Sequence, residues 1–351
     1  MRKYIIPIFI PHFGCPHACV FCNQKKITGV QTDVKVTDIK TIIIKHLDGI
    51  TRSYFIEVAF YGGSFTALPM ELQREFLLPV YQYVKSGKIN AIRISTRPDC
   101  ITEEILRQLK SLDVQTIELG AQSFDNHVLY QAERGHNAQA IRKAAHFIKA
   151  QGFTLGIQLM PGLPGDTAKS IFYSLFETVK LHPDIVRIYP TIVLTDTKMA
   201  AMYKTGGYVP LTLEEAKHYV AVMKLVFLRE NIKVIRMGLQ SSETLDDGKV
   251  VLAGPYHPAF GEMVDSYLFY LMVAAVLDEV AVGGGENIYI HHALKDASKV
   301  RGSKNENTKQ LKKVYQLQKI YFLSDLAESN TVEIGIDGLR YKMNLHLLER
   351  I

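Results

Sequence analysis

The chain has 351 residues, of which 47% are hydrophobic and 22% are charged. These proportions are ordinary for a globular protein and exclude a disordered or low-complexity chain. The length is too great for one small domain and predicts a large barrel with an appendage, or two domains. The formal net charge is +6, and residues 295–319 account for all of it with eight basic and two acidic side chains.

The N-terminus and the cysteines indicate the compartment. The first apolar run ends at Pro11 without a small-residue cleavage site, and the later apolar stretch from Tyr267 to Leu277 is too short to span a bilayer. Three of the four cysteines lie within eight residues, which is a metal-binding pattern rather than a disulfide framework. We therefore expect a cytoplasmic protein that does not contact a membrane.

Short apolar runs alternate with amphipathic segments over the first 240 residues. The predicted strands are 4–10, 57–61, 91–96, 116–119, 153–160 and 185–189, with 233–237 as a seventh. The predicted helices are 37–47, 71–85, 102–112, 138–151, 167–181 and 212–231. Repeated strand–helix units predict a parallel sheet, and this number of units favours a partial (β/α)6-type TIM-like barrel over the alternative of a doubly wound sheet.

The alternation stops near Gly238, where a different kind of structure is predicted. A buried helix is expected over 264–280, followed by a hinge or tight turn at Gly283–Gly285. A short strand, a basic helix and a hairpin at 332–343 that turns at Asp337–Gly338 complete a small C-terminal α+β appendage. The expected domains are a barrel over 1–240, an extension packing on it over 241–282, and the α+β domain over 283–351.

The first predicted strand leads into a loop that holds Cys15, Cys19 and Cys22. Thiolate is a soft ligand suited to iron–sulfur clusters and to zinc. A 4Fe–4S cluster in an electron-transfer ferredoxin takes four cysteines, so three would leave one iron open to a substrate or cofactor. In barrels of this type the functional loops follow the C-terminal ends of the strands, as this loop does.

Two other interpretations of the cysteine loop remain open. The same cysteines could bind zinc together with His12 or His17. Cys19 and Cys22 also have the spacing of a thioredoxin-like pair, although that leaves Cys15 without a role. Cys100 follows Asp99 just before a predicted helix, and we expect it to be structural.

With this cysteine spacing, and Phe21 just before the last cysteine, the loop resembles that of the radical S-adenosylmethionine (SAM) superfamily. The resemblance implies a 4Fe–4S cluster whose open iron binds the amino and carboxylate groups of SAM. It also implies that the cluster reductively cleaves SAM to a 5′-deoxyadenosyl radical, which requires an electron donor such as flavodoxin or ferredoxin.

Polar or glycine-rich segments follow five further predicted strands on the same face of the barrel. Paired glycines allow a backbone to approach a ligand closely, and arginine holds carboxylates with two parallel hydrogen bonds. In the family, the matching glycine turn supports the methionine amino group through its backbone; its third position is often acidic there and is Ser64 here. The predicted cofactor-binding residues are Phe21, Gly62, Gly63, Ser64, Ser95, Arg97, Gln122 and Gln158.

Several segments sharpen the resemblance to the radical domain of the Elongator catalytic subunit, a family that modifies the wobble uridine of tRNA. They are 61–69, 95–99, 118–123, 134–136, 158–165 and 189–207. The likeness covers residues 4–240, and no other part of the chain is long enough to be the acetyltransferase domain of that subunit. The resemblance therefore does not imply transfer of an acetyl-derived group. The resemblance implies a tRNA substrate.

The basic window at 295–319 could grip RNA phosphates, or it could be a solvated helix face. The leading hypothesis is therefore a radical SAM enzyme that acts on tRNA or another RNA. A radical SAM enzyme acting on a small molecule such as a tetrapyrrole, similar to oxygen-independent coproporphyrinogen oxidase, is the alternative. A third hypothesis is a non-enzymatic zinc or nucleic-acid-binding module.

Overall fold

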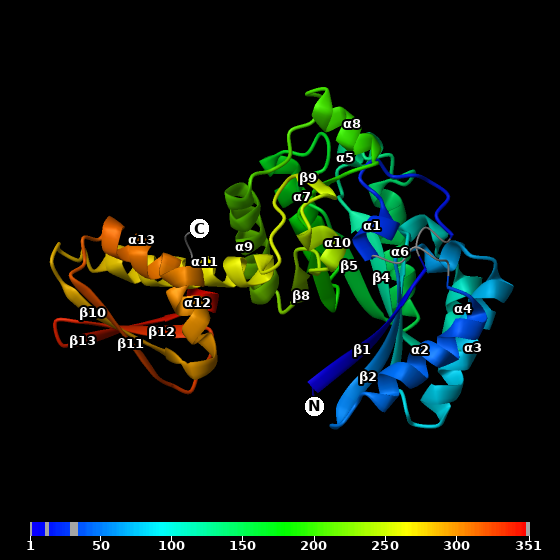
Figure 1. Cartoon of the computed structure of the whole chain (residues 1–351), viewed down its shortest axis with the longest axis horizontal. Helices are drawn as coiled ribbons and strands as arrows, with labels where there is room; N and C mark the ends of the chain where they lie inside the picture. Colours follow the sequence, from blue (N-terminus) through cyan, green and yellow to red (C-terminus); the bar gives the residue numbers. More distant parts are fainter. Residues whose placement is uncertain (1, 11–13, 29–33, 349–351) are drawn as a thin grey trace. The chain divides into compact units, whose positions relative to one another are not determined.

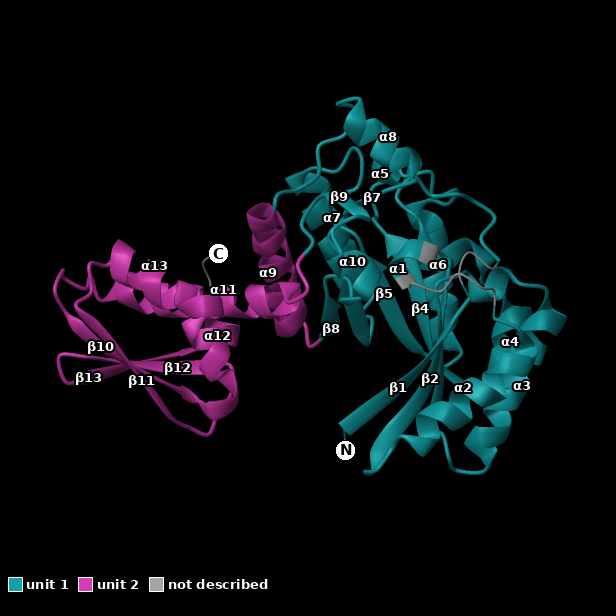
Figure 2. Cartoon of the chain, viewed as in Figure 1, with its two compact units in different colours: residues 1–212, 232–256 teal, residues 213–231, 257–351 magenta. Residues whose placement is uncertain are grey.

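The structure is a computed structural model that describes residues 2–10, 14–28 and 34–348 (Figure 1). The chain forms two compact units (Figure 2). Unit 1 comprises Met1–Thr212 and Ile232–Tyr256, and unit 2 comprises Leu213–Asn231 and His257–Ile351.

Unit 1 is built on seven parallel strands that curl into a half-barrel. In sheet order they are β1 (Arg2–Phe9), β2 (Tyr54–Tyr61), β3 (Ala91–Thr96), β4 (Val114–Gln122), β5 (Thr154–Leu159), β6 (Ile185–Ile188) and β8 (Lys233–Met237). Sheet order follows chain order, as expected when each strand returns beside its predecessor through a right-handed crossover. The partial barrel predicted from the strand–helix repeats is confirmed, with 233–237 as its seventh strand.

The crossovers of unit 1 are mostly helical. The helices are α1 (Gln24–Thr28), α2 (Val36–Asp48), α3 (Met70–Lys85), α4 (Glu103–Ser111), α5 (Asn126–Gln131), α6 (Ala138–Ala150), α7 (Ala168–Lys180), α8 (Lys198–Lys204) and α10 (Glu243–Asp246). A short antiparallel pair joins β7 (Val193–Leu194) to β9 (Val251–Ala253). Threonine caps begin α4 and α7: the Thr102 and Thr167 hydroxyls accept hydrogen bonds from the backbone N–H of Ile105 and Ser170.

The two faces of the barrel sheet differ in polarity. Side chains that face the helices are apolar and fully buried, as with Ile6, Phe60 and Ile117. The alternate positions face the lumen, and there β2, β3 and β4 carry the buried charges of Glu57, Arg93 and Glu118. Since successive strand residues point to opposite faces, the apolar core lies between sheet and helices and leaves a polar lumen for chemistry.

Unit 2 contains two long helices, α9 (Leu213–Arg229) and α11 (Phe260–Glu279), and a four-stranded sheet. The sheet order is β11 (Lys319–Leu326), β10 (Asn287–Ala293), β12 (Thr331–Ile336) and β13 (Leu339–Asn344), with β10 and β11 parallel and the other pairs antiparallel. The predicted hairpin turn is confirmed: Asp337 and Gly338 both have positive φ, as a two-residue type I′ turn requires. The basic segment forms two helices, α12 (Ala297–Arg301) and α13 (Glu306–Val314), because the chain turns at Gly302 with φ 76°.

The boundaries of unit 2 differ from those expected at residues 240 and 282. Long-range packing places α9 and α11 with the C-terminal sheet, while residues 241–256 stay with the barrel. Lys224 of α9 forms an ion pair with Asp265 of α11, and Asn307 of α13 donates a 2.8 Å hydrogen bond to the Ser266 carbonyl. A backbone hydrogen bond holds the turn at Gly283–Gly285: the Gly285 N–H donates to the Gln316 carbonyl at 2.9 Å.

Helix α11 is longer than the apolar stretch noted in the sequence. Its 20 residues include a window of mean hydropathy 1.5, so by length and composition alone it could cross a membrane. Half of that window is buried within the structure, and the core helix of a globular protein meets the same criteria.

Candidate active site

A cavity of about 720 Å³ occupies the lumen of the half-barrel. Its walls come from the cysteine loop, from strands β1 to β6 and the turns that follow them, and from residues 239–242, all within unit 1. The volume falls within the range of about 300–1,000 Å³ that is usual for ligand pockets.

Ten of the eleven site residues expected from the sequence line this cavity. They are Cys15, Cys19, Phe21, Cys22, Gly62, Gly63, Ser95, Arg97, Gln122 and Gln158. Ser64 does not line it: the side chain is fully buried, and its hydroxyl accepts a 3.3 Å hydrogen bond from the Arg97 N–H and lies 3.2 Å from the Thr96 hydroxyl. Ser64 therefore contacts the end of β3 and the residue that follows it, and does not face the cavity.

Backbone contacts hold the cysteine loop against the barrel. The Val20 N–H donates to the Ala132 carbonyl at 3.2 Å, and the Val20 carbonyl accepts from the Met199 N–H at 2.9 Å. Val20 and Phe21 belong to a buried apolar cluster, against which Cys19 and Cys22 pack. The cysteines are thus presented from an anchored loop rather than from a free one.

Burial and the charge of neighbouring thiolates disfavour the thiolate forms of Cys15 and Cys22 by raising their pKa values. Desolvation, followed by the charges of Cys19 and Cys15, raises the pKa of Cys22 to about 12. Burial also raises the pKa of Cys15, although Arg97 and Arg134 act in the opposite direction. A bound metal reverses this balance, because its positive charge deprotonates coordinating thiols outright.

Three buried polar atoms of cavity-lining residues have no hydrogen-bond partner among the described residues. They are Arg97 Nη1, Gln122 Oε1 and Arg134 Nε. The other guanidinium nitrogens of Arg134 are used: Nη1 donates to Cys19 Sγ at 2.9 Å, and Nη2 donates to the Gly120 carbonyl at 2.6 Å. Since an unmade hydrogen bond in a buried site is costly, these atoms indicate a polar ligand beside the cysteines.

The described residues contain no group of three His, Cys, Asp or Glu side chains placed to hold one metal ion, and this finding does not separate zinc from an iron–sulfur cluster at the cysteine loop. His17 lines the cavity, and His12 lies outside the described residues. Cys100 is half-buried, does not line the cavity, and has its thiol pKa raised chiefly by burial.

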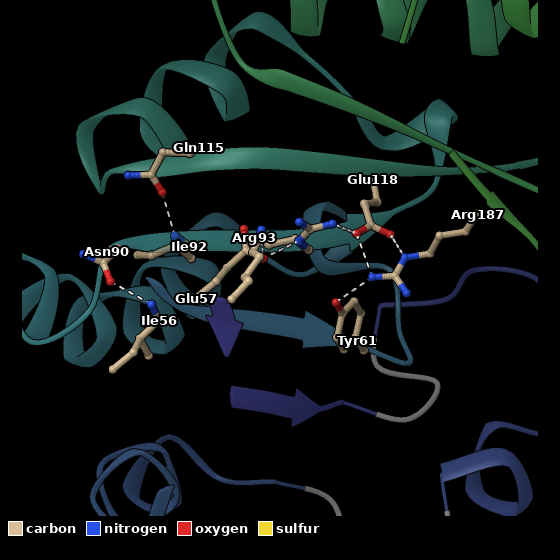
Figure 3. Close-up of polar contacts among 10 residues, drawn as sticks. Ile56, Glu57, Tyr61, Asn90, Ile92, Arg93, Gln115, Glu118 and Arg187 are labelled. Atoms are coloured by element: carbon tan, nitrogen blue, oxygen red, sulfur yellow. Dashed lines mark hydrogen bonds and ion pairs between the residues drawn. The ribbon is translucent and has the colours of Figure 1, made fainter. Parts of the chain in front are cut away.

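A charge network joins residues of β2, β3, β4 and β6 within the half-barrel (Figure 3). Arg93 donates to Glu57 at 2.9 Å and also to Glu118, and Arg187 donates to Glu118 at 2.6 and 3.2 Å. Arg187 and its neighbour Tyr61 line the cavity, and neither was among the residues expected from the sequence. The sequence does contain a signal for this network, because four otherwise apolar strands each carry a charged residue that faces the lumen. These residues are Glu57, Arg93, Glu118 and Arg187.

Two protein-family models match the chain over residues 9–174 and 183–269. The first is that of the radical SAM superfamily, and the second is that of the Radical_SAM C-terminal domain. The chain belongs to the radical SAM superfamily. Membership implies enzymatic activity with a 4Fe–4S cluster and SAM, and the orphaned polar atoms beside three clustered cysteines fit both groups.

Curated relatives of this radical SAM chain include tRNA-modifying enzymes. It is 30% identical over 233 residues to the tRNA uridine(34) acetyltransferase of Methanocaldococcus jannaschii, a match covering 61% of this chain and 42% of that enzyme. It is 29% identical over 173 residues to human Elongator complex protein 3, covering 44% and 32% of the two chains. The chain therefore spans less than half the length of these relatives.

An uncharacterized protein of M. jannaschii is 30% identical over 231 residues, a match covering 62% of this chain and 69% of that protein. Among solved structures, the archaeal Elp3 of Methanocaldococcus infernus, with an N-terminal deletion, superimposes with a TM-score of 0.61 at 24% identity. That superposition covers 76% of this chain and 63% of the other, and it supports the same radical SAM fold.

Proposed function

We propose that this chain is a radical SAM enzyme that modifies RNA, with tRNA as its substrate. The observation that carries the proposal is that the three clustered cysteines and the unpartnered atoms of Arg97, Gln122 and Arg134 line one lumenal cavity. The cavity volume of about 720 Å³ lies within the usual range for ligand pockets, and the relatives include a protein named tRNA uridine(34) acetyltransferase.

In this proposal Cys15, Cys19 and Cys22 hold the 4Fe–4S cluster. When bound, the cluster supplies the electron that cleaves SAM to a 5′-deoxyadenosyl radical, and an electron donor such as flavodoxin or ferredoxin reduces it. Arg134 donates to Cys19 Sγ and brings a positive charge to the thiolates. Hydrogen bonds to cluster sulfurs are one of the means by which proteins set the reduction potential.

The residues around the cysteines supply contacts for SAM. Gly62 has a φ of 92° and lets the backbone after β2 approach the cofactor. Arg97 is held by Asp99 at 2.9 and 3.0 Å, which leaves its free Nη1 to bind an anionic group such as the SAM carboxylate. Gln122 Oε1 accepts from a donor on the cofactor, and Phe21, Gly63, Ser95 and Gln158 complete the walls.

Gly14 fits the cysteine loop closely against the turn after β2. Its φ is +72°, and an added Cβ would lie 2.4 Å from the Ser64 carbonyl oxygen. We therefore expect Gly14→Ala to displace the loop and lower the iron bound per chain after anaerobic reconstitution. Gly87→Ala is the matched control: its φ is +73°, and none of the described atoms lies within 4 Å of the new methyl group.

The free energy of unfolding of Gly87→Ala should fall by about 1–2 kcal/mol, the cost of a left-handed backbone conformation for a residue other than glycine. This variant should keep its iron. Equal iron content in the two variants would show that close packing at Gly14 does not position the cysteines.

A strongly basic surface on unit 2 supports an RNA substrate. Of the eight cations in residues 295–319, Lys299 pairs with Asp265 and Asp296. The other seven are exposed, and within the described part of the chain none of them forms an ion pair. Of the two acids in this window, Asp296 is buried and only Glu306 is exposed. Seven exposed cations on one short segment can neutralise several phosphates.

We expect the triple substitution Lys309→Gln, Lys312→Gln and Lys313→Gln to weaken tRNA binding. Phosphate binding releases counterions, so a plot of log affinity against log salt concentration should become shallower by about one for each phosphate that the variant no longer binds. The measurement is a fluorescence titration of anaerobically prepared protein with bulk tRNA at several salt concentrations. Nucleoside mass spectrometry after incubation with SAM and a reductant then tests whether tRNA is modified.

The matched control replaces Lys88, Lys143 and Lys169 with glutamine. These lysines are exposed on unit 1, so the control removes the same total charge as the first triple variant. If the two triple variants lose affinity equally, net charge rather than the basic surface explains the binding. Wild-type protein that does not bind tRNA at low salt would favour a small-molecule substrate instead.

A further inference from the structure

The part of the cavity that lies along β2 and β6 presents a row of hydrogen-bond donors. Arg187 Nη2 donates to the Tyr61 hydroxyl at 2.9 Å, and Arg187 Nη1 donates to the Tyr189 hydroxyl at 3.2 Å. All three side chains line the cavity. Because guanidinium N–H bonds lie in one plane, the two phenol oxygens are held near the plane of Arg187.

The network behind Arg187 fixes its orientation (Figure 3). Both Glu118 oxygens accept from Arg187, and Glu118 also accepts from Arg93, which pairs with Glu57. Glu57 and Glu118 are almost completely buried, and neither lines the cavity. Arg187 therefore cannot turn away from the two tyrosines without giving up both of its hydrogen bonds to the buried Glu118.

Each of these tyrosines can donate its own proton to a ligand. A phenol oxygen that accepts from a guanidinium keeps its O–H free to point elsewhere. Burial, with a further contribution from the charge of Glu118, raises the pKa of Tyr61 above its ordinary value, so the phenol stays protonated. The described lining residues include no Asp or Glu, and hence no carboxylate in the wall competes for these protons.

The neighbouring surface suits a flat ring. Phe9 lies beside Tyr61 with ring centroids 6.3 Å apart, and both line the cavity. Ile192 and Leu194 add apolar surface. A flat heterocycle bound here would pack on aromatic and aliphatic side chains and meet donors along one edge.

We propose that Tyr61, Tyr189 and Arg187 recognise the substrate base through its carbonyl oxygens and thereby select uracil over cytosine. Uracil carries carbonyl acceptors at positions 2 and 4, whereas cytosine carries an amino donor at position 4. In the same pose that amino group would face O–H and N–H donors, and buried donors would remain unpaired. The inference rests on the proposed function, because it takes the substrate to be RNA.

The test compares a uridine decamer with a cytidine decamer, which carry equal numbers of phosphates. Binding of each labelled oligomer to the anaerobically reconstituted protein is measured by fluorescence anisotropy at physiological salt. Wild-type protein should prefer the uridine decamer about tenfold, as expected when buried donors lose their acceptor. Tyr61→Phe and Tyr189→Phe each remove one hydroxyl and should reduce that preference about fivefold, the effect of one neutral hydrogen bond.

Tyr130→Phe is the matched control, since this side chain is 80% exposed and does not line the cavity; it should leave the preference unchanged. The triple lysine variant should weaken both oligomers equally and keep their ratio. Equal binding of the two decamers by wild-type protein, with iron content and SAM cleavage intact, would overturn this inference and leave the radical chemistry standing. Fully loaded protein that cleaves no SAM would overturn the proposed function and this inference with it.

Discussion

Replacing Cys15, Cys19 or Cys22 with alanine should abolish reductive cleavage of SAM. Each substitution removes one thiolate from a set of three, and within the described residues of the cavity wall there is no fourth cysteine to replace it. The remaining two ligands hold a cluster poorly. Iron and sulfide per chain should therefore fall after reconstitution, and no 5′-deoxyadenosine should form with SAM and dithionite.

Cys100→Ala is the matched control for this experiment. Cys100 is also half-buried but does not line the cavity, so its variant should keep its iron and its cleavage activity. Full iron content and normal cleavage in Cys19→Ala would show that the cysteine loop is not the cluster site.

Glu118→Gln should destabilise unit 1 strongly. The Glu118 side chain is 3% exposed and accepts hydrogen bonds from both Arg93 and Arg187. A neutral amide would leave the buried Arg93 and the partly buried Arg187 without their shared counter-charge, and breaking a buried ion pair in this way costs about 3–5 kcal/mol. Hydrogen exchange at the amides of β3 to β6 measures the free energy of unfolding of this unit separately from unit 2.

The matched control is Glu133→Gln, which breaks an ion pair with Lys198 on the surface. Both side chains of that pair are about half exposed, and such pairs contribute less than about 1 kcal/mol. If Glu118→Gln costs no more than Glu133→Gln, the lumenal network does not hold the half-barrel together.

The fold of unit 1 could be predicted from the sequence because its signals are local. Apolar runs such as 4–10 and 91–96 alternate with amphipathic segments, and a threonine at position 102 followed by two glutamates begins a helix. The cavity could be predicted in part for a related reason. The carboxyl ends of parallel strands meet at one edge of a sheet, so residues such as Arg97 and Gln122 had to converge there.

Other features depend on contacts between distant residues. Glu57, Arg93, Glu118 and Arg187 come from four strands, and only the barrel curvature brings them together. Ser64 was expected in the cavity because it is the third position of the glycine turn that resembles the family's cofactor-binding turn, but its hydroxyl lies 3.2 Å from that of Thr96. Helix α9 was assigned to the barrel by its position in the chain, yet the structure packs it with α11 in unit 2.

Electron paramagnetic resonance of the reduced cluster, with and without SAM, tests directly whether SAM binds to an open iron in the cavity. Three protein thiolates would leave one iron of a 4Fe–4S cluster open, and unpartnered polar atoms of the same cavity could contact SAM. We expect SAM to change the spectrum of the reduced protein, and Gly63→Val to weaken this effect by blocking close approach of the backbone. An unchanged spectrum at saturating SAM, in protein with a full complement of iron, would contradict this expectation.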